Sequence, residues 1–278
     1  MALQTPPGDH IRQLVCGLAE PDRSNRLLLM LTAFMDDSDM SGEGPMAVLA
    51  GWLMSSSQWA DFSDDWRKEV LTLGGERLKV FKPTTRDLRD ERNKARLLAA
   101  MALIGRYNPL GLLATIPHGP FKAEMAKVAK KRLRSPYLYA SVGMVLLLTK
   151  DLTKRNVEGP VDFVFDYQPG QTGPITQHWD SLYRSSWTGD RYILKKSPPK
   201  FEDDESIVAL QAAHLLAWNV RWHAGDTAAG RLQYVFPWPE HIRILHMDWR
   251  AADVAMVADA VSKTGPPTKR RRSRGREG

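Results

Sequence analysis

An apolar run that ends abruptly in acidic residues limits the folds open to this chain. The run LLLMLTAFM occupies residues 27–35 and is followed at once by Asp36 and Asp37. An apolar stretch of this length, without polar alternation, is typical of a strand that is buried on both faces of a sheet. After the turn-forming segment DSDMSGEGP comes a second apolar run, MAVLAGWLMS, at residues 46–55. The two runs predict an antiparallel strand pair joined by a loop.

Helical and strand patterns alternate along the rest of the chain. Further strands are expected at residues 77–83, 110–118 and 160–168 and near 192–194. Helices are expected at residues 55–75, 85–107, 121–133, 136–152, 175–183, 206–225 and 249–262. This order predicts an α/β fold with a mixed β-sheet flanked by helices. The body of the sequence contains no repeat and no linker, so we expect one α/β domain at 26–262. A peripheral segment at 1–25 should precede it, and a disordered basic tail at 263–278 should follow it.

Composition excludes several classes of protein. Hydrophobic residues make up 43% of the 278 residues, enough for a substantial core. Cys16 is the one cysteine, so neither an internal disulfide nor a cysteine-based zinc site can form. The N-terminal sequence lacks the pattern of a signal peptide, and the apolar runs are far shorter than the ~20 residues that span a bilayer. We therefore expect a cytoplasmic protein that does not enter a membrane.

The positive charge is concentrated at the C-terminal end. The chain carries a net charge of +7, and the segment from Lys263 onward supplies +6 of it, which leaves the body close to neutral. Such a tail either binds phosphates without sequence preference or merely adds solubility. One dense basic stretch inside the body is either part of a nucleic-acid groove or a solvated helix face. The residues predicted to contact nucleic acid are Lys130, Lys131, Arg132, Arg270, Arg271 and Arg272.

Two aspartates are candidates for a metal site. Asp36 ends the first buried strand, and Asp166 ends the strand pattern PVDFVFD. Strand alternation places Val161, Phe163 and Phe165 on one face and leaves Asp166 on the other, at the mouth of the strand. Open α/β sheets bind ligands at the carboxyl ends of strands, and carboxylate oxygens are ligands that suit Mg²⁺ or Mn²⁺. The alternative is that both acids are ordinary turn residues.

A polar stripe on an otherwise apolar helix supplies a third candidate. The stripe has helical spacing and consists of Gln211, His214, Trp218 and Arg221. A histidine in such a place is commonly satisfied by a backbone carbonyl. Alternatively, the stripe faces the acids, and His214 acts as a metal ligand or a proton carrier. The acidic run at residues 202–205 is expected to be a solvated loop, from which one carboxylate could still reach the site.

The order of these features resembles domain-of-unknown-function family 3800. Its usual features are an I-D-E-S-G-like strand end, a mid-chain strand that ends in Asp and a late L-Q-x-A-D-L-L-A helix. The matching features here are Asp36-Asp37-Ser38, Gly51-Trp52, Trp59, Trp66, Asp166 after PVDFVF, and LQAAHLLAWNVR at residues 210–221. That family resembles the ribonuclease-H-like fold. The resemblance therefore implies this fold, with Asp36 as the first metal-binding acid and Asp166 as the second.

The chain departs from the family pattern at four positions. His214 stands where the family usually has Asp, so it either serves the metal site or marks a degenerate copy. Asp37 replaces the usual Glu, and Asp39 lies where Gly is common. Lys82 occupies what is often a His, which removes another possible ligand.

Two functions from different classes are compatible with these residues. The first is a two-metal phosphodiester hydrolase of nucleic acid, in which Asp36, Asp166 and His214 are catalytic and hold Mg²⁺ or Mn²⁺, with an acid from Asp203–Glu205 as an alternative ligand. The second is a non-catalytic module that binds nucleic acid or a protein partner. The phosphate-binding, dinucleotide-binding and serine-hydrolase motifs are all missing from the sequence.

Overall fold

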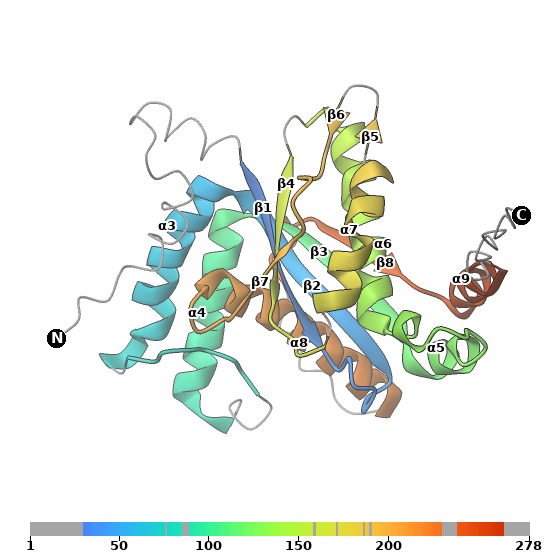
Figure 1. The fold of residues 1–278 in the computed structure, drawn as a ribbon. Coiled ribbons are helices and arrows are strands. Elements are labelled where there is room, and N and C mark those ends of the chain that lie inside the picture. Colours follow the sequence, from blue (N-terminus) through green and yellow to red (C-terminus); the bar gives the residue numbers. More distant parts are fainter. Residues whose placement is uncertain are drawn as a thin grey trace, which may run out of the picture.

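A six-stranded mixed sheet with helices on both faces organises the protein (Figure 1). The computed structural model describes residues 30–75, 77–84, 89–157, 160–170, 172–185, 187–188, 191–229 and 238–263. The strand order is β7-β4-β1-β2-β3-β8. The predicted fold class, a mixed β-sheet flanked by helices, is thereby confirmed.

The first buried run becomes a central strand. It pairs antiparallel with the second run, as predicted, and parallel with the strand that ends in Asp166. The strands of the sheet are β1 (Leu31–Ser38), β2 (Met46–Ser55), β3 (Leu110–Pro117), β4 (Val161–Asp166), β7 (Lys200–Glu202) and β8 (Ile244–Asp248). A separate pair is formed by β5 (Trp187–Thr188) and β6 (Arg191–Tyr192).

The helices divide between the two faces of the sheet. One face is covered by α3 (Ser56–Trp66), α4 (Glu91–Tyr107) and α8 (Val208–Ala229). The other face is covered by α5 (His118–Met125), α6 (Pro136–Lys154), α7 (Thr172–Ser185) and α9 (Ala251–Lys263). Because both faces are covered, the central strands are buried on both sides, which explains their unbroken apolar sequence.

Tryptophans fix the α3–α8 face to the sheet. Trp52, Trp59 and Trp66 are fully buried. The indole of Trp52 donates to the Ala212 carbonyl at 2.9 Å, and that of Trp59 to the Thr32 carbonyl at 2.8 Å. Each large ring thus buries apolar area and also satisfies its one polar group.

Close backbone approach explains a glycine inside β2. A Cβ built at Gly51 would lie 2.0 Å from the Phe34 carbonyl oxygen of β1. A side chain here would push the two central strands apart, so the strand interior requires glycine at this point.

Several predicted elements were wrong or incomplete. No strand forms at residues 77–83, because the Phe81 N–H bonds to the Gln211 side chain instead of to a neighbouring strand. The helix expected at 121–133 ends at Met125, and a short 3-10 helix follows at Lys131–Leu133. The strands β7 and β8 were missed, since they are short and only partly buried. The peripheral segment at 1–25 lies outside the described residues.

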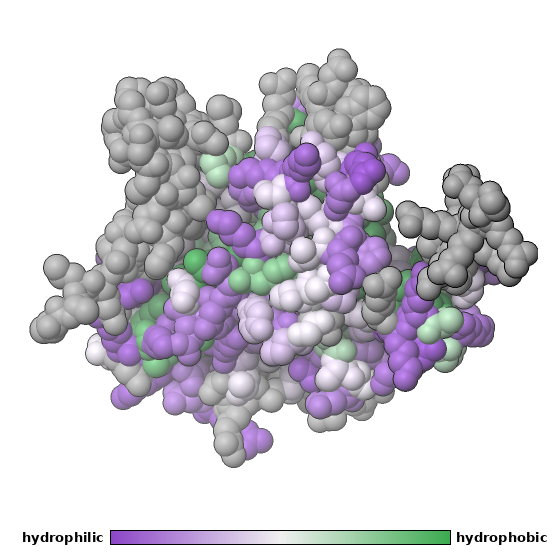
Figure 2. All heavy atoms as spheres, viewed as in Figure 1, coloured by the Kyte–Doolittle hydropathy of each residue, from purple (hydrophilic) through white to green (hydrophobic). Residues whose placement is uncertain are grey.

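Polar side chains cover most of the described surface on the face shown in Figure 2. In the view of Figure 2, hydrophilic side chains predominate and hydrophobic ones form small separate areas. Among the described helices, none has the length and apolar content to cross a membrane.

Candidate active site

The ends of β1 and β4 bring two of the predicted site residues together. The parallel register pairs Met35 with Phe165, so that the next residues, Asp36 and Asp166, lie at the same edge of the sheet. Asp36 is 2% exposed and Asp166 is 7% exposed. Desolvating two neighbouring carboxylates is unfavourable unless hydrogen bonds or a cation compensate them.

The third predicted residue contacts the first directly. Helix α8 lies across β1 and β2, and the Nδ1 of His214 is 2.8 Å from Oδ2 of Asp36. The other carboxylate oxygen of Asp36 accepts from the Asp37 N–H at 2.7 Å. The polar stripe of α8 therefore faces the acids, and His214 is not satisfied by a backbone carbonyl at this nitrogen.

Hydrogen bonds from the described residues leave one oxygen of the Asp37 carboxyl group uncompensated for its burial. This oxygen, Oδ1, is buried and has no hydrogen-bond partner among the described residues. Burial raises the pKa of Asp37 to about 7, with further contributions from Asp36 and Asp166, while Lys82 acts in the opposite direction. Asp37 lies on the α6 face of the sheet, where burial and the same aspartates raise the pKa of Tyr137.

Asp166 is perturbed in the same way. Burial and the charge of Asp36 raise the pKa of Asp166 to about 6, and Asp203 adds to the effect. Lys82 and His214 oppose it. One oxygen of Asp166 accepts from the Gln168 side chain at 3.2 Å. Asp36, Asp37 and Asp166 thus form one electrostatically coupled group, which we name the acid cluster.

A fourth aspartate, Asp204, is buried next to Lys82. Asp204 belongs to the acidic run that was expected to be solvated, yet its side chain is only 7% exposed and forms an ion pair with Lys82. Asp203 and Glu205 remain nearer the surface, as the solvated-loop interpretation requires. The interpretation was therefore wrong for Asp204.

Gln211 connects the segments around the acid cluster. Its side chain is fully buried, and its Oε1 accepts from the Trp66 indole and from the Phe81 N–H, each at 3.1 Å. Its Nε2 donates to the Asp204 carbonyl at 3.0 Å. One amide on α8 therefore holds the Lys82 segment and the Asp204 segment in fixed positions. We name this arrangement the Gln211 bridge.

The acid cluster opens to the surface at Asp37. A cavity of about 350 Å³ is lined by Asp37, Asp39, Met40, Ser41, Glu43, Gln168, Pro169 and Arg221. Arg221, the last residue of the predicted stripe, lies at this opening and donates to the Ser38 hydroxyl at 3.5 Å. A guanidinium beside a carboxylate-lined opening suits an anionic group such as a phosphate.

The conformation of the loop after β1 depends on Asp39. Asp39 has φ 62°, in the left-handed region that glycine favours and that Asp tolerates better than most residues. Its carboxylate accepts from the N–H groups of Glu43 at 3.0 Å and Gly44 at 2.6 Å. Asp39 therefore shapes the loop beside the opening.

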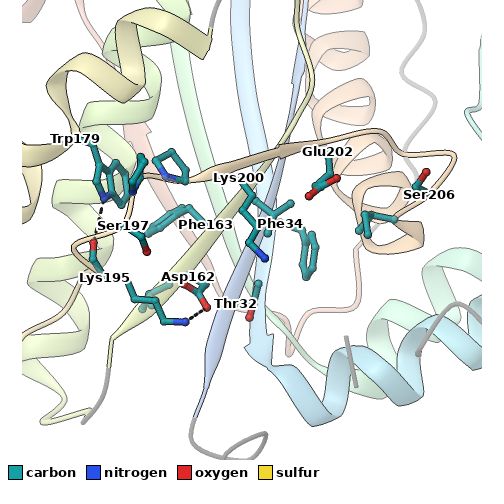
Figure 3. Close-up of a pocket in the computed structure, with 15 residues that line it drawn as sticks. Thr32, Phe34, Asp162, Phe163, Trp179, Lys195, Ser197, Lys200, Glu202 and Ser206 are labelled. Atoms are coloured by element: carbon teal, nitrogen blue, oxygen red, sulfur yellow. Dashed lines mark hydrogen bonds and ion pairs between the residues drawn. The ribbon is translucent and has the colours of Figure 1, made fainter. Parts of the chain in front are cut away.

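A second cavity, of about 370 Å³, begins on the same face of the sheet as Asp36 and Asp166 (Figure 3). Phe34 and Val164 line it, each two residues before an aspartate of the acid cluster. Figure 3 shows Lys195 directed at Asp162 near one end and Glu202 and Ser206 near the other. None of the predicted site residues lines this cavity.

The chemistry of the acid cluster suits the divalent ion that the sequence predicts. The donors fit, because the acid cluster offers hard oxygen ligands, an orphaned carboxylate oxygen and excess negative charge. The described residues contain no preassembled group of three or more His, Cys, Asp or Glu side chains that could hold an ion. The carboxylates of the site suit Mg²⁺ or Mn²⁺, but the described side chains do not point at one common position.

The predicted basic residues are only partly described. Lys130 and Lys131 are exposed between α5 and α6, as a nucleic-acid contact requires. The side chain of Arg132 and the tail residues Arg270, Arg271 and Arg272 lie outside the described part.

Sequence reasoning gave too little weight to three residues. Lys82 was noted only as a lost ligand, Asp204 only as one of four acids, and Tyr137 not at all. The spacing of Lys82 in VFKP after a weak strand pattern could have suggested a charge near the site. Nothing in the sequence distinguished Asp204 from its acidic neighbours.

Comparison with known proteins adds little to this geometry. No protein-family model and no curated protein matches the chain. Two similar solved structures are Bst-RNase HIII in complex with Mn²⁺ and a point mutant of Bst-RNase HIII, each with 15% identity and a TM-score of 0.42. Each alignment covers 75% of this chain and 58% of the other. The mixed sheet is consistent with the expected ribonuclease-H-like fold.

Proposed function

We propose that this protein is a divalent-metal-dependent phosphodiester hydrolase that acts on nucleic acid. The observation that carries the proposal is the acid cluster: three aspartates at adjacent strand ends, crowded enough to raise the pKa of Asp37 to about 7 and that of Asp166 to about 6. Clusters with such perturbed pKa values occur preferentially at functional sites. Kinship with domain-of-unknown-function family 3800 is part of the same proposal and rests on the order of the motifs.

The side chains of the acid cluster have distinct roles in this proposal. Asp36 and Asp166 would hold Mg²⁺ or Mn²⁺, and Asp37 would add an oxygen at the opening. A bound ion of this kind activates water and stabilises charge on the leaving oxygen. Because a carboxylate only accepts hydrogen bonds, the proton of His214 lies on Nδ1, toward Asp36. Its Nε2 can then act as a metal ligand or a proton carrier, the two predicted roles.

Arg221 would receive the substrate. It lines the cavity into which Asp37 opens, and its fork of N–H donors matches a phosphodiester. Lys130 and Lys131 would add contacts to the nucleic-acid backbone that do not depend on sequence.

The decisive variant removes both central charges. Asp36→Asn together with Asp166→Asn should abolish Mn²⁺ binding in calorimetric titration and reduce cleavage of labelled single- and double-stranded DNA and RNA to background. Asparagine keeps the side-chain volume but removes the charge that attracts the cation.

Asp162→Asn is the matched control. It lies on β4, like Asp166, but forms an ion pair with Lys195 away from the acid cluster. This control should bind Mn²⁺ as the wild type does. Wild-type protein that binds no Mn²⁺, even with nucleic acid present, would refute the proposal.

The second candidate is a non-catalytic module with a degenerate metal site, binding nucleic acid or a protein. It is favoured by the direct contact of His214 with Asp36 and by the lack of a preassembled three-ligand group among the described residues. Nucleic-acid binding that persists in the Asp36→Asn/Asp166→Asn variant, without cleavage by the wild type, would select this function.

A further inference from the structure

A lysine lies where the acid cluster needs positive charge. The ammonium of Lys82 forms an ion pair with the buried Asp204. It is also close enough to Asp37 and Asp166 to lower the pKa of both, against the effect of burial. Lys82 therefore acts electrostatically on three carboxylates that come from β1, β4 and the segment before α8.

The position of Lys82 is imposed by the fold. The preceding residue, Phe81, is buried, and its N–H donates to Gln211 at 3.1 Å. The same amide donates to the carbonyl of Asp204 at 3.0 Å. The Gln211 bridge thus holds both partners of the ion pair, three residues before the histidine that contacts Asp36.

The end of the Lys82 side chain is nevertheless free to move outward. Its side chain is 37% exposed, whereas that of Asp204 is 7% exposed. A long side chain that reaches inward from the surface can withdraw without disturbing its backbone. The ion pair therefore combines a fixed buried anion with a displaceable cation.

We infer that Lys82 is a tethered counter-ion of the acid cluster, which neutralises the cluster without metal and competes with a divalent ion for it. This inference rests on the proposed function. It explains why the donors suit a metal ion although the described ligands do not converge on one. Binding of the ion would require Lys82 to leave Asp204, which then becomes available as a further carboxylate ligand.

Calorimetric titration with Mn²⁺ tests the competition. Lys82→Gln should bind Mn²⁺ on the order of tenfold more tightly than the wild type, because a like charge has been removed from the site. Lys82→Arg keeps the charge and should keep the wild-type affinity. The matched control is Lys79→Gln, which removes the exposed Lys79–Glu205 ion pair between the same two segments and should change the affinity by less than about twofold.

Thermal melting in EDTA tests the counter-ion role without metal. Lys82→Gln should melt at a lower temperature than Lys79→Gln, because the acid cluster loses a positive charge that opposes its repulsion. Mn²⁺ should raise the melting temperature of Lys82→Gln more than it raises that of the wild type. This second measurement also shows whether each variant is folded.

The outcomes separate the inference from the proposed function. Wild-type binding that is unchanged or weakened by Lys82→Gln overturns the inference and leaves the metal-dependent function intact. Failure of every variant to bind Mn²⁺ overturns both. Equal melting of Lys82→Gln and Lys79→Gln in EDTA overturns the counter-ion role.

Discussion

Asp36 and Asp37 are adjacent in the sequence but face different surroundings. Asp36 lies on the α8 face, where His214 and a backbone N–H satisfy its two oxygens. Asp37 lies on the α6 face, near Tyr137, with one oxygen buried and without a hydrogen bond among the described residues. The sequence predicted that Asp36 ends a buried strand, but strand alternation alone could not show which of the two neighbours would be left with an unpaired buried oxygen.

The raised pKa values predict how stability changes with pH when metal is removed. In the unfolded chain both carboxyl groups ionise near pH 3.8, whereas in the folded protein Asp166 ionises near 6 and Asp37 near 7. Between these limits the folded state binds more protons than the unfolded state, so these groups make the free energy of unfolding fall as pH rises. Their stabilising contribution is lost as pH rises from about 4 to about 7.

Urea unfolding in EDTA between pH 5 and 8 measures this effect. In the Asp37→Asn variant the free energy of unfolding should fall less steeply with pH than in the wild type. The difference in slope should be about 1.4 kcal/mol per pH unit up to about pH 7, because one carboxyl group no longer titrates. The exposed Asp259, paired with Lys263 on α9, supplies the control Asp259→Asn, whose curve should run parallel to that of the wild type. A parallel curve for Asp37→Asn would show that its pKa is not raised.

Helix α8 is the element on which the site depends most. Its inward face carries Gln211 and His214 one turn apart, and both make long-range contacts with other segments. The sequence predicted this helix and its polar stripe, because the pattern is strongly periodic. It did not predict the partners of Gln211, because these lie on the irregular segments around residues 81 and 204, where local patterns are weak.

Replacing Gln211 measures what its bridge contributes. Gln211→Leu should lower the free energy of unfolding by about 2–4 kcal/mol, because the Trp66 indole and the Phe81 N–H lose their acceptor inside the core. Lys150→Leu, which places the same new side chain at an exposed position of α6, should stay within about 0.5 kcal/mol of the wild type. Urea denaturation compares the two, and equal effects would show that the bridge is not stabilising.

At the scale of the whole molecule, the order of the strands in the sheet could not be predicted from local sequence patterns. The antiparallel start, the burial of the central strands and the α/β class could be predicted from apolar runs. The parallel pairing of β1 with β4 could not, since it joins segments more than 100 residues apart and leaves no local trace. That pairing places Asp36 beside Asp166, so the resemblance supplied the juxtaposition that periodicity could not.

Because the body is close to neutral, the contribution of a local pair of lysines to nucleic-acid binding can be measured. Lys130→Glu with Lys131→Glu should weaken nucleic-acid binding and reduce the slope of log affinity against log salt by about 2, if each lysine contacts one phosphate. Lys150→Glu with Lys154→Glu gives the same charge change near the far end of α6 and should leave the slope unchanged. Fluorescence anisotropy with labelled oligonucleotides at several salt concentrations decides between contact and a solvated face.

The distribution of the site along the chain also affects its biosynthesis. The strands β1, β2 and β3 are complete once residue 117 has left the ribosome, but the other edge of β1 and the face under α8 stay uncovered until β4 and α8 follow. During that interval the growing polypeptide exposes apolar strand surface, a state prone to aggregation. Asp36 meets Asp166 and His214 only once β4 and α8 have been synthesised, so the acid cluster of a nascent chain stays incomplete until then.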